Sequence, residues 1–258
     1  MAEGDYIDSF DTSAQSTDIL GMCTDGTHIW HTNWASKLVQ KWEIDGTFVS
    51  AWATGVTYPY SVATNGTNIY VFDAAATKRI RKHTMDGTYV SQITVGNYNS
   101  VEISLEDDSY FYVIDPSTKK VHKLEEDGTS VSSWDLTANN ANPYDLCSDG
   151  THIWVLDFTD KEIYKYTIAG TYVSSWSLDA LNGNPYGITT DESYFYAGDR
   201  TDDEIYRYAG PAAVGTNMKV NISDVFKDVD SIQINIGDVW KDVTSIQQNI
   251  GDVWKTVF

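Results

Sequence analysis

Apolar and polar residues alternate along most of the first 210 positions, in short segments that end at turn-forming residues. Residues 161–166 (KEIYKY) and 171–176 (TYVSSW) are typical of these segments. Strict alternation over about four to eight residues predicts a strand with one buried face. An Asp-Gly or Asn-Gly pair between two such segments predicts a hairpin. The pattern therefore predicts an all-β protein built from hairpins.

The turns recur with a period close to 42 residues. Turn pairs occur at residues 25–26, 65–66, 107–108, 149–150 and 191–192, and a second series begins at residues 45, 86, 127 and 169. Two turns of this kind in each period divide the repeat into four short strands. Four strands in a repeat of about 42 residues are typical of a β-propeller blade.

The last strand of the fifth repeat is missing from its expected place, because the chain reads Gly210-Pro211 there. Residues 4–10 (GDYIDSF) match residues 170–176 (GTYVSSW), the last strand of the fourth repeat. We therefore expect the N-terminal strand to complete the last blade and to leave no open edge where the ring closes. The sequence predicts a five-bladed β-propeller over residues 1–209.

The fifth repeat carries the motif of a known family. Its residues 184–191 (NPYGITTD), 194–196 (YFY), Asp199 and 204–208 (EIYRY) resemble the NHL type of propeller repeat. The resemblance covers residues 4–209 and implies the architecture alone. Propellers of this type serve as enzymes, scaffolds and receptors, so the resemblance implies no particular function.

Several residues recur with the period of the blades and are expected to pack in the core. Cys23 and Cys147 occupy equivalent positions two residues before a turn Asp, where small buried residues are a better interpretation than a disulfide or a metal site. Aromatic residues at the ends of the outer strands are expected to pack between blades; they are Phe10, Trp52, Trp134 and Trp176.

After a linker at residues 210–217, the C-terminal residues 218–258 repeat every 14 positions in units such as 235–241 (NIGDVWK). The 3-4 spacing of Ile and Val is compatible with a coiled coil. However, residues 221–258 contain no Ala, Leu, Glu or Arg, and Gly-Asp pairs favour hairpin turns. We therefore favour a small β-meander. Its expected strands are residues 218–222, 225–229, 232–236, 239–243, 246–250 and 253–257.

This C-terminal module is expected to mediate assembly. Phe226, Trp240 and Trp254 are 14 residues apart and would form an apolar row that a monomer should not leave in water. The repeat units resemble those near the ends of phage-encoded fibre and virion-associated proteins. That resemblance implies a homo-oligomer, with a trimer as the first expectation, or contact with another virion protein.

The charge and the apolar pattern exclude several classes of partner. The chain has 37 acidic and 17 basic residues, a net charge of −20, which disfavours nucleic acid and anionic membrane surfaces. It has no apolar run of the length that spans a bilayer, and its first residues lack the basic and apolar segments of a signal peptide, so we expect none. We expect a protein that is made in the cytoplasm and does not insert into membranes, and the resemblance of its C-terminal repeats implies incorporation into a virion.

The two faces of the predicted propeller differ in their loops. The turns between first and second strands are tight, and we expect them to leave little room for a site. Longer loops at residues 53–59, 135–143 and 177–185 lie on the opposite face. Binding residues collect on loops, so this face is the candidate surface.

Carboxylates recur at one position of that face. Asp73, Asp115, Asp157 and Asp199 are 42 residues apart, with Asn33 at the equivalent position of the first repeat. A ring of carboxylates could bind Ca²⁺ or sugar hydroxyls. Alternatively, each side chain caps the amides of its own turn, and we favour this second interpretation because every blade carries the residue.

Aromatic residues near the same mouth offer a second kind of site. Tyr60, Tyr144 and Tyr186 each follow a Pro at the start of an innermost strand, and Trp34 and Phe158 lie in the loops. These rings could stack on a sugar. The three tyrosines could equally serve to hold neighbouring blades apart.

A reaction centre usually breaks repeat symmetry, and we found no lone His, Cys or Glu that does so. We therefore predict a protein that is not an enzyme and needs no cofactor, with Ca²⁺ as the one ion considered. The main hypothesis is a binding or structural appendage protein, using the open propeller face on a glycan or host-surface receptor. The alternatives are a glycan-active enzyme with a carboxylate-lined pore and a cytoplasmic protein-interaction scaffold.

Overall fold

The computed structural model describes residues 2–95, 103–106, 110–136 and 140–210, and four short strands between residues 233 and 256. The chain divides into two compact units, residues 1–214 and 215–258, and each is described by itself. No helix among these residues has the length and apolar character needed to cross a membrane.

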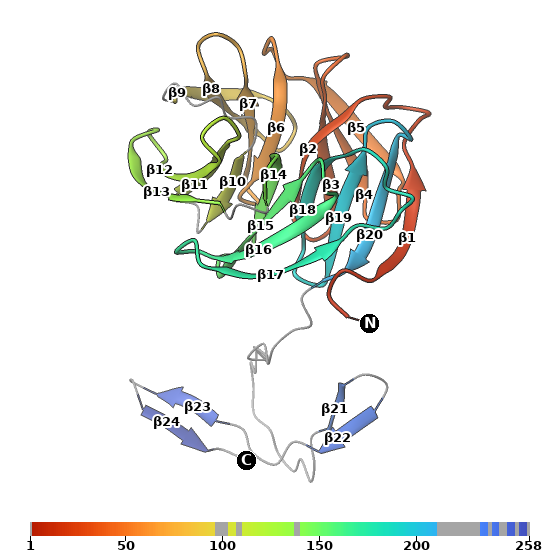
Figure 1. The fold of residues 1–258 in the computed structure, drawn as a ribbon, viewed down its shortest axis with the longest axis vertical. Coiled ribbons are helices and arrows are strands. Elements are labelled where there is room, and N and C mark those ends of the chain that lie inside the picture. Colours follow the sequence, from red (N-terminus) through yellow and green to blue (C-terminus); the bar gives the residue numbers. More distant parts are fainter. Residues whose placement is uncertain are drawn as a thin grey trace. The chain divides into compact units, whose positions relative to one another are not determined.

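The first unit is a ring of five four-stranded antiparallel sheets, which confirms the predicted five-bladed propeller (Figure 1). The first blade contains β2 (Ile19–Thr24), β3 (His28–Asn33), β4 (Leu38–Glu43) and β5 (Phe48–Ala53). The second contains β6 (Pro59–Thr64), β7 (Asn68–Asp73), β8 (Arg79–Thr84) and β9 (Tyr89–Thr94). The third contains β10 (Ile103–Glu106), β11 (Tyr110–Asp115), β12 (Lys120–Glu125) and β13 (Ser130–Asp135).

The fourth blade contains β14 (Pro143–Ser148), β15 (His152–Asp157), β16 (Glu162–Thr167) and β17 (Tyr172–Ser177). The fifth contains β18 (Pro185–Thr190), β19 (Tyr194–Asp199), β20 (Glu204–Ala209) and the N-terminal strand β1 (Tyr6–Asp11). The innermost strands β2, β6, β10, β14 and β18 contact one another around the axis of the ring.

The N-terminal strand closes the ring as predicted. Strand β1 pairs antiparallel with β20, and Phe10 lies opposite Ile205. The pairing extends past the strand ends, because the Gly4 amide donates to the Ala209 carbonyl at 2.9 Å. Figure 1 shows β1 as the outer strand beside β20. The two ends of the propeller are therefore held within one sheet.

Glu3 adds a second link between the N-terminus and the rest of the ring. Its Oε1 accepts a hydrogen bond from the Trp154 indole at 3.0 Å, and its Oε2 lies 3.3 Å from the Lys165 ammonium group. Both partners belong to the fourth blade. The N-terminal segment thus contacts the neighbouring blade as well as the blade that it completes.

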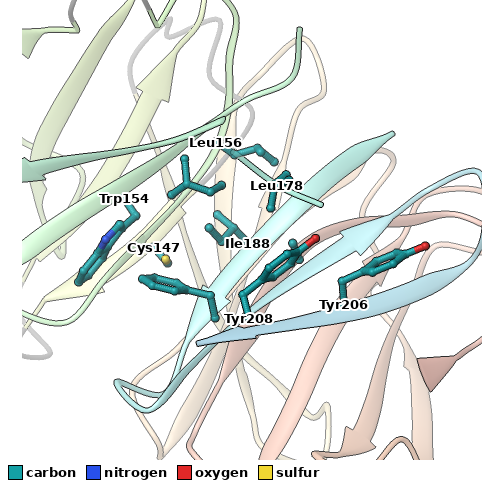
Figure 2. Close-up of a cluster of buried hydrophobic side chains, with 10 residues drawn as sticks. Cys147, Trp154, Leu156, Leu178, Ile188, Tyr206 and Tyr208 are labelled. Atoms are coloured by element: carbon teal, nitrogen blue, oxygen red, sulfur yellow. The ribbon is translucent and has the colours of Figure 1, made fainter. Parts of the chain in front are cut away.

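The core consists of apolar clusters between neighbouring blades. Figure 2 shows the cluster between the fourth and fifth blades, where Cys147, Trp154 and Leu156 face Ile188 and Tyr208. The prediction of small buried cysteines is confirmed, because Cys23 and Cys147 are both free and buried. Burial raises the pKa of both thiols well above the ordinary value, so they remain protonated.

The outer-strand aromatic residues join each blade to the next one. Trp52 of β5 lies against Gly87 in the outer turn of the second blade, so that a Cβ atom at Gly87 would overlap its indole ring. At Gly46 the Cβ would lie 2.7 Å from Cγ of Phe10. The same contact recurs between Trp134 and Gly170 and between Trp176 and Gly4. This aromatic-on-glycine contact confirms that these residues pack between blades.

The described residues of the C-terminal unit form two hairpins. Strand β21 (Gln233–Ile236) pairs with β22 (Val239–Asp242), and β23 (Gln247–Ile250) pairs with β24 (Val253–Thr256). These strands confirm the preference for β structure over a coiled coil. The two hairpins have the same register, since Asn235 lies opposite Trp240 and Asn249 opposite Trp254.

The predicted meander is only partly seen. Within the described residues each hairpin forms its own two-stranded sheet, and β22 does not pair with β23. The expected strands at residues 218–222 and 225–229, and with them Phe226, lie outside the described residues.

A buried histidine makes the propeller sensitive to acid. His31 is fully buried in β3, and burial lowers the pKa of His31 from 6.5 to about 4 despite a hydrogen bond to the Thr32 carbonyl. In the unfolded chain this residue takes up a proton at higher pH than in the folded protein. The free energy of unfolding therefore falls as the pH decreases from about 6.5 to about 4.

We expect His31→Gln to flatten the dependence of stability on pH in this window. The contribution of His31 is at most about 3 kcal/mol across the window. Chemical denaturation between about pH 7 and pH 4 measures it. The control is His152→Gln, whose imidazole is partly exposed on β15. An unchanged pH dependence in His31→Gln would contradict the assignment.

Candidate functional site

Five aromatic residues and one arginine form a continuous row on the loop face of the propeller. We call this set the aromatic row; it consists of Phe158, Tyr144, Tyr186, Arg200, Trp34 and Tyr58. Tyr144 and Tyr186 are the second residues of the innermost strands β14 and β18, and the other four lie next to strand ends. The row crosses the fourth, fifth, first and second blades.

One half of the row is a compact group of three rings. The centroids of Tyr144 and Tyr186 are 4.6 Å apart in an edge-to-face arrangement. Phe158 lies 5.1 Å from Tyr186 and 5.7 Å from Tyr144. The sequence predicted that these three residues lie near the same end of the propeller axis, and in the structure their rings are in direct contact.

The other half of the row extends from Arg200 to the second blade. The Arg200 guanidinium lies 4.9 Å from the Tyr186 ring and 5.9 Å from the Trp34 ring. Trp34 in turn lies 6.4 Å from Tyr58, and their planes differ by 19°. Trp34 is 37% exposed and Tyr58 is 43% exposed, so this half of the row is open to solvent.

An ion pair fixes Arg200. Its Nε donates to Oδ1 of Asp18, and Oδ2 of Asp18 accepts from the Ala35 amide at 3.0 Å. Burial of Arg200 opposes its charge, but the hydrogen bond to Asp18, the charge of Asp18 and the hydroxyl of Tyr186 together outweigh this effect and raise the pKa of Arg200. The guanidinium is therefore charged and held in place between two rings.

Amide groups lie beside the row. The side-chain amide of Asn184 donates to Oγ1 of Thr201 at 2.7 Å, and that of Asn142 donates to Oγ1 of Thr159 at 3.0 Å. Asn142 and Asn184 precede the Pro-Tyr pairs of β14 and β18. Polar groups with fixed orientation thus accompany the rings of Tyr144 and Tyr186.

The four aspartates of the predicted ring are buried and bind backbone amides. Oδ2 of Asp199 accepts from the Asn184 amide at 2.7 Å, and its Oδ1 accepts from the amides of Thr201 and Asp202 at 2.7 and 3.0 Å. Asp73, Asp115 and Asp157 cap their own loops in the same way. This geometry is the capping arrangement, and we leave these carboxylates out of the proposed ligand site.

The caps have a further effect on the row. The Asp73 carboxylate accepts a hydrogen bond from the backbone amide of Tyr58 at 3.0 Å. The Asp157 carboxylate accepts one from the backbone amide of Asn142 at 2.8 Å. They fix the loops that carry the rings. Among the residues that the structure describes, no group of three or more His, Cys, Asp or Glu side chains is arranged for a metal ion, including Ca²⁺.

Tyr60 packs on the core between two blades. It is half-buried in β6 and packs against the apolar cluster between the second and third blades. Of the predicted aromatic site residues, Trp34, Tyr144, Phe158 and Tyr186 come together in the row.

Three residues near this surface were missed by the sequence analysis. Arg200 and Tyr58 belong to the row, and Asp145 is a buried carboxylate on the innermost strand β14. Oδ2 of Asp145 accepts from the Ile188 amide of the fifth blade at 2.6 Å. The first, second and fifth repeats have Gly21, Ser61 and Gly187 at this position, so an alignment of the repeats could have identified Asp145.

The turn face is less closed than expected. A cavity of about 400 Å³ opens at the opposite ends of the innermost strands. Its described lining comes from the first turns of four blades; it includes Thr24, Asp25, Asn65, Ser148, Asp149, Thr190 and Asp191. The carboxylates of Asp25, Asp149 and Asp191 accept hydrogen bonds from their own turn amides. The expectation of little room at this face is wrong, because the turns stand apart around the axis.

No protein family and no curated protein matches the chain. Its structure is similar to that of a glutaminyl cyclase from Myxococcus xanthus, with a TM-score of 0.65, 10% identity and coverage of 78% of this chain and 94% of that one. It is also similar to a chain of a nidogen/laminin complex (TM-score 0.51, 17% identity, 71% and 73% coverage). A protein of unknown function from Bacteroides thetaiotaomicron has a TM-score of 0.51, 15% identity and 80% and 73% coverage.

These likenesses show the fold and correct one prediction. The prediction that the protein is not an enzyme, which was drawn from the regularity of the repeats, is wrong, because a glutaminyl cyclase has the same fold over nearly its whole length. At 10% identity the likeness does not bring that activity to this chain. The comparisons support the propeller fold. They give no support to a phage-like tail, a virion role or glycan binding.

Proposed function

We propose that the aromatic row binds a carbohydrate chain. A pyranose ring has flat faces of C–H groups and a rim of hydroxyls, so its site needs exposed aromatic rings with hydrogen-bonding groups beside them. The row offers both, since Trp34 and Tyr58 are exposed next to a fixed guanidinium. The contact of six side chains from four blades in one line is the observation that carries the proposal.

The shape and charge of the surface favour this ligand over others. The row crosses four blades, which suits an extended chain of several sugar rings. The net charge of −20 disfavours a polyanion such as a nucleic acid. A glycan on a host surface is the narrower form of this proposal.

We expect Trp34→Ala and Tyr186→Ala each to weaken carbohydrate binding without unfolding the protein. A stacking contact is worth about 0.5–1.5 kcal/mol, which corresponds to about twofold to tenfold in Kd. A glycan array followed by calorimetry measures the effect. Tyr89→Ala is the control, because Tyr89 is 52% exposed but lies on the outer strand β9. Equal affinities for all four proteins would contradict the proposal.

A glycan-active enzyme is the second candidate. Asp145 is the observation in its favour, because a carboxylate that breaks the repeat symmetry is buried one residue after Tyr144 of the row. Release of reducing ends from an oligosaccharide that the row binds would distinguish an enzyme from a binding protein.

We also propose that the C-terminal unit assembles copies of this chain. Its described strands form two separate two-stranded sheets, and isolated hairpins are at best marginally stable in water. A further copy, or another virion protein, would supply the packing that they lack.

We therefore expect the full chain to be a homo-oligomer, with a trimer as the leading expectation. Light scattering coupled to gel filtration measures the molar mass. Trp240→Asp combined with Trp254→Asp should yield monomers, whereas Trp52→Phe in the propeller should leave the mass unchanged. A monomeric wild-type protein would contradict this proposal.

A further inference from the structure

Arg200 breaks the symmetry of the row. The four equivalent loop positions carry Trp34, Ala74, Pro116 and Phe158. Arg200 is thus the one cation among the six members of the row, and it stands in the middle of it. Its guanidinium lies between the rings of Tyr186 and Trp34, so a sugar that covers these rings also covers Arg200.

The charge of Arg200 is balanced within the protein. Asp18 is buried and is bound to Nε of Arg200 and to the Ala35 amide. Asp18 takes one of the five N–H groups of the guanidinium. The Arg200 side chain is still 32% exposed. It can therefore donate hydrogen bonds outward without presenting an unpaired positive charge.

Acidic residues flank Arg200 in the loop after β19. The pKa of Asp203 is raised by its burial and by the nearby carboxylates of Asp11, Asp18, Asp199 and Asp202. Four neighbouring negative charges that act on one carboxyl group indicate a negative local potential. This potential would repel an incoming carboxylate or sulfate, because the charge of Arg200, the cation of the row, is already neutralised by Asp18.

We infer that the carbohydrate bound by the aromatic row is uncharged, and that Arg200 binds its hydroxyl groups. This inference rests on the proposed function and names the class of ligand. A guanidinium suits the task because it is planar, lies flat against rings, and donates parallel hydrogen bonds from a rigid fork. A lysine carries the same charge but offers neither the plane nor the fork.

The first test compares neutral and acidic oligosaccharides of equal length. The probes are the cello-, manno-, malto- and chito-hexaoses, and the hexauronates of galacturonic, mannuronic and guluronic acid. We expect binding to a neutral probe, with a Kd that changes less than about twofold between about 20 and 500 mM NaCl, since no net charge is neutralised. Binding of a hexauronate at least about tenfold tighter, and lost at high salt, would overturn the inference while leaving carbohydrate binding intact. Binding of none of the probes would overturn both.

The second test uses variants of Arg200 with a matched control. Arg200→Lys should weaken binding of the neutral probe by about tenfold or more, because an ammonium group cannot reproduce the parallel hydrogen bonds of the planar guanidinium to the hydroxyls. The control is Arg207→Lys. Arg207 is also paired with a carboxylate, that of Asp8, and lies 5.0 Å from the Tyr194 ring, but it is not part of the row. Equal binding by Arg200→Lys and the wild type would overturn the role of Arg200.

Asp18→Asn removes the negative charge that neutralises Arg200. The amide oxygen can still accept from the Ala35 amide, while Arg200 loses its counter-ion. We expect this variant to gain measurable, salt-sensitive binding of a hexauronate that the wild type does not bind. The absence of any such gain would contradict the argument that Asp18 sets the preference for an uncharged ligand.

Discussion

Deletion of residues 1–10 should remove more than about 4 kcal/mol from the free energy of unfolding, or prevent folding altogether. It takes away most of β1, the Phe10 contact with Gly46 and the bonds of Glu3 to the fourth blade. It also exposes the edge of β20 to other chains. Thermal unfolding followed by circular dichroism measures the loss, and light scattering detects aggregation.

A circular permutant is the matched control for this deletion. The Gly4 amide and the Ala209 carbonyl are bonded at 2.9 Å, so residues 2–11 can be joined after residue 210 by a short linker. This protein keeps every strand of the propeller and begins at residue 12. It should melt close to the wild type, which would show that the strand and not the chain end is required. A deletion variant as stable as the full chain would contradict the closure of the ring by β1.

Gly87→Ala should be among the most destabilising single substitutions in this protein, at about 3 kcal/mol or more. Gly87 has a φ of 90°, and its added Cβ would overlap the Trp52 indole that packs on it. Chemical denaturation measures the change. The backbone strain and the steric overlap both contribute to this value.

Gly26→Ala separates the two contributions. Gly26 has a φ of 84°, but a Cβ there would meet no atom within 4 Å. It should therefore cost only the strain of a left-handed backbone, about 1–2 kcal/mol. Equal losses in both variants would show that the aromatic-on-glycine contact tolerates a methyl group, contrary to our expectation.

The architecture could be predicted from the sequence because it depends on short-range patterns that recur. Alternation defined the strands, and the match of residues 4–10 to residues 170–176 defined the closure. The capping role of the aspartates was also accessible, since Asp115-Pro-Ser-Thr contains both the carboxylate and the groups that it binds.

The complete row could not be predicted in the same way. Tyr58 and Arg200 are separated by 142 positions in the sequence. They share a surface only because the closed ring brings the fifth, first and second blades side by side. Each lies at a position where the other repeats differ, so periodicity gave no signal. The cavity at the turn face could not be predicted for a related reason. It is formed by the distance between turns of different blades, which the sequence of a single turn does not indicate.

The contact between an outer-strand aromatic and a glycine has one exception around the ring. Between the second and third blades, Ile93 stands where the other junctions have Trp or Phe, and its Cδ1 lies 3.7 Å from the Cβ position of Gly128. An aliphatic side chain covers less of the neighbouring blade than an indole does. Under mechanical force or on heating, the propeller should therefore open first between the second and third blades, which is not where the two ends of the chain meet. We therefore expect the closure between the termini, which has the Phe10–Gly46 and Trp176–Gly4 contacts in addition to the pairing of β1 with β20, to be held more firmly than this junction in the middle of the sequence.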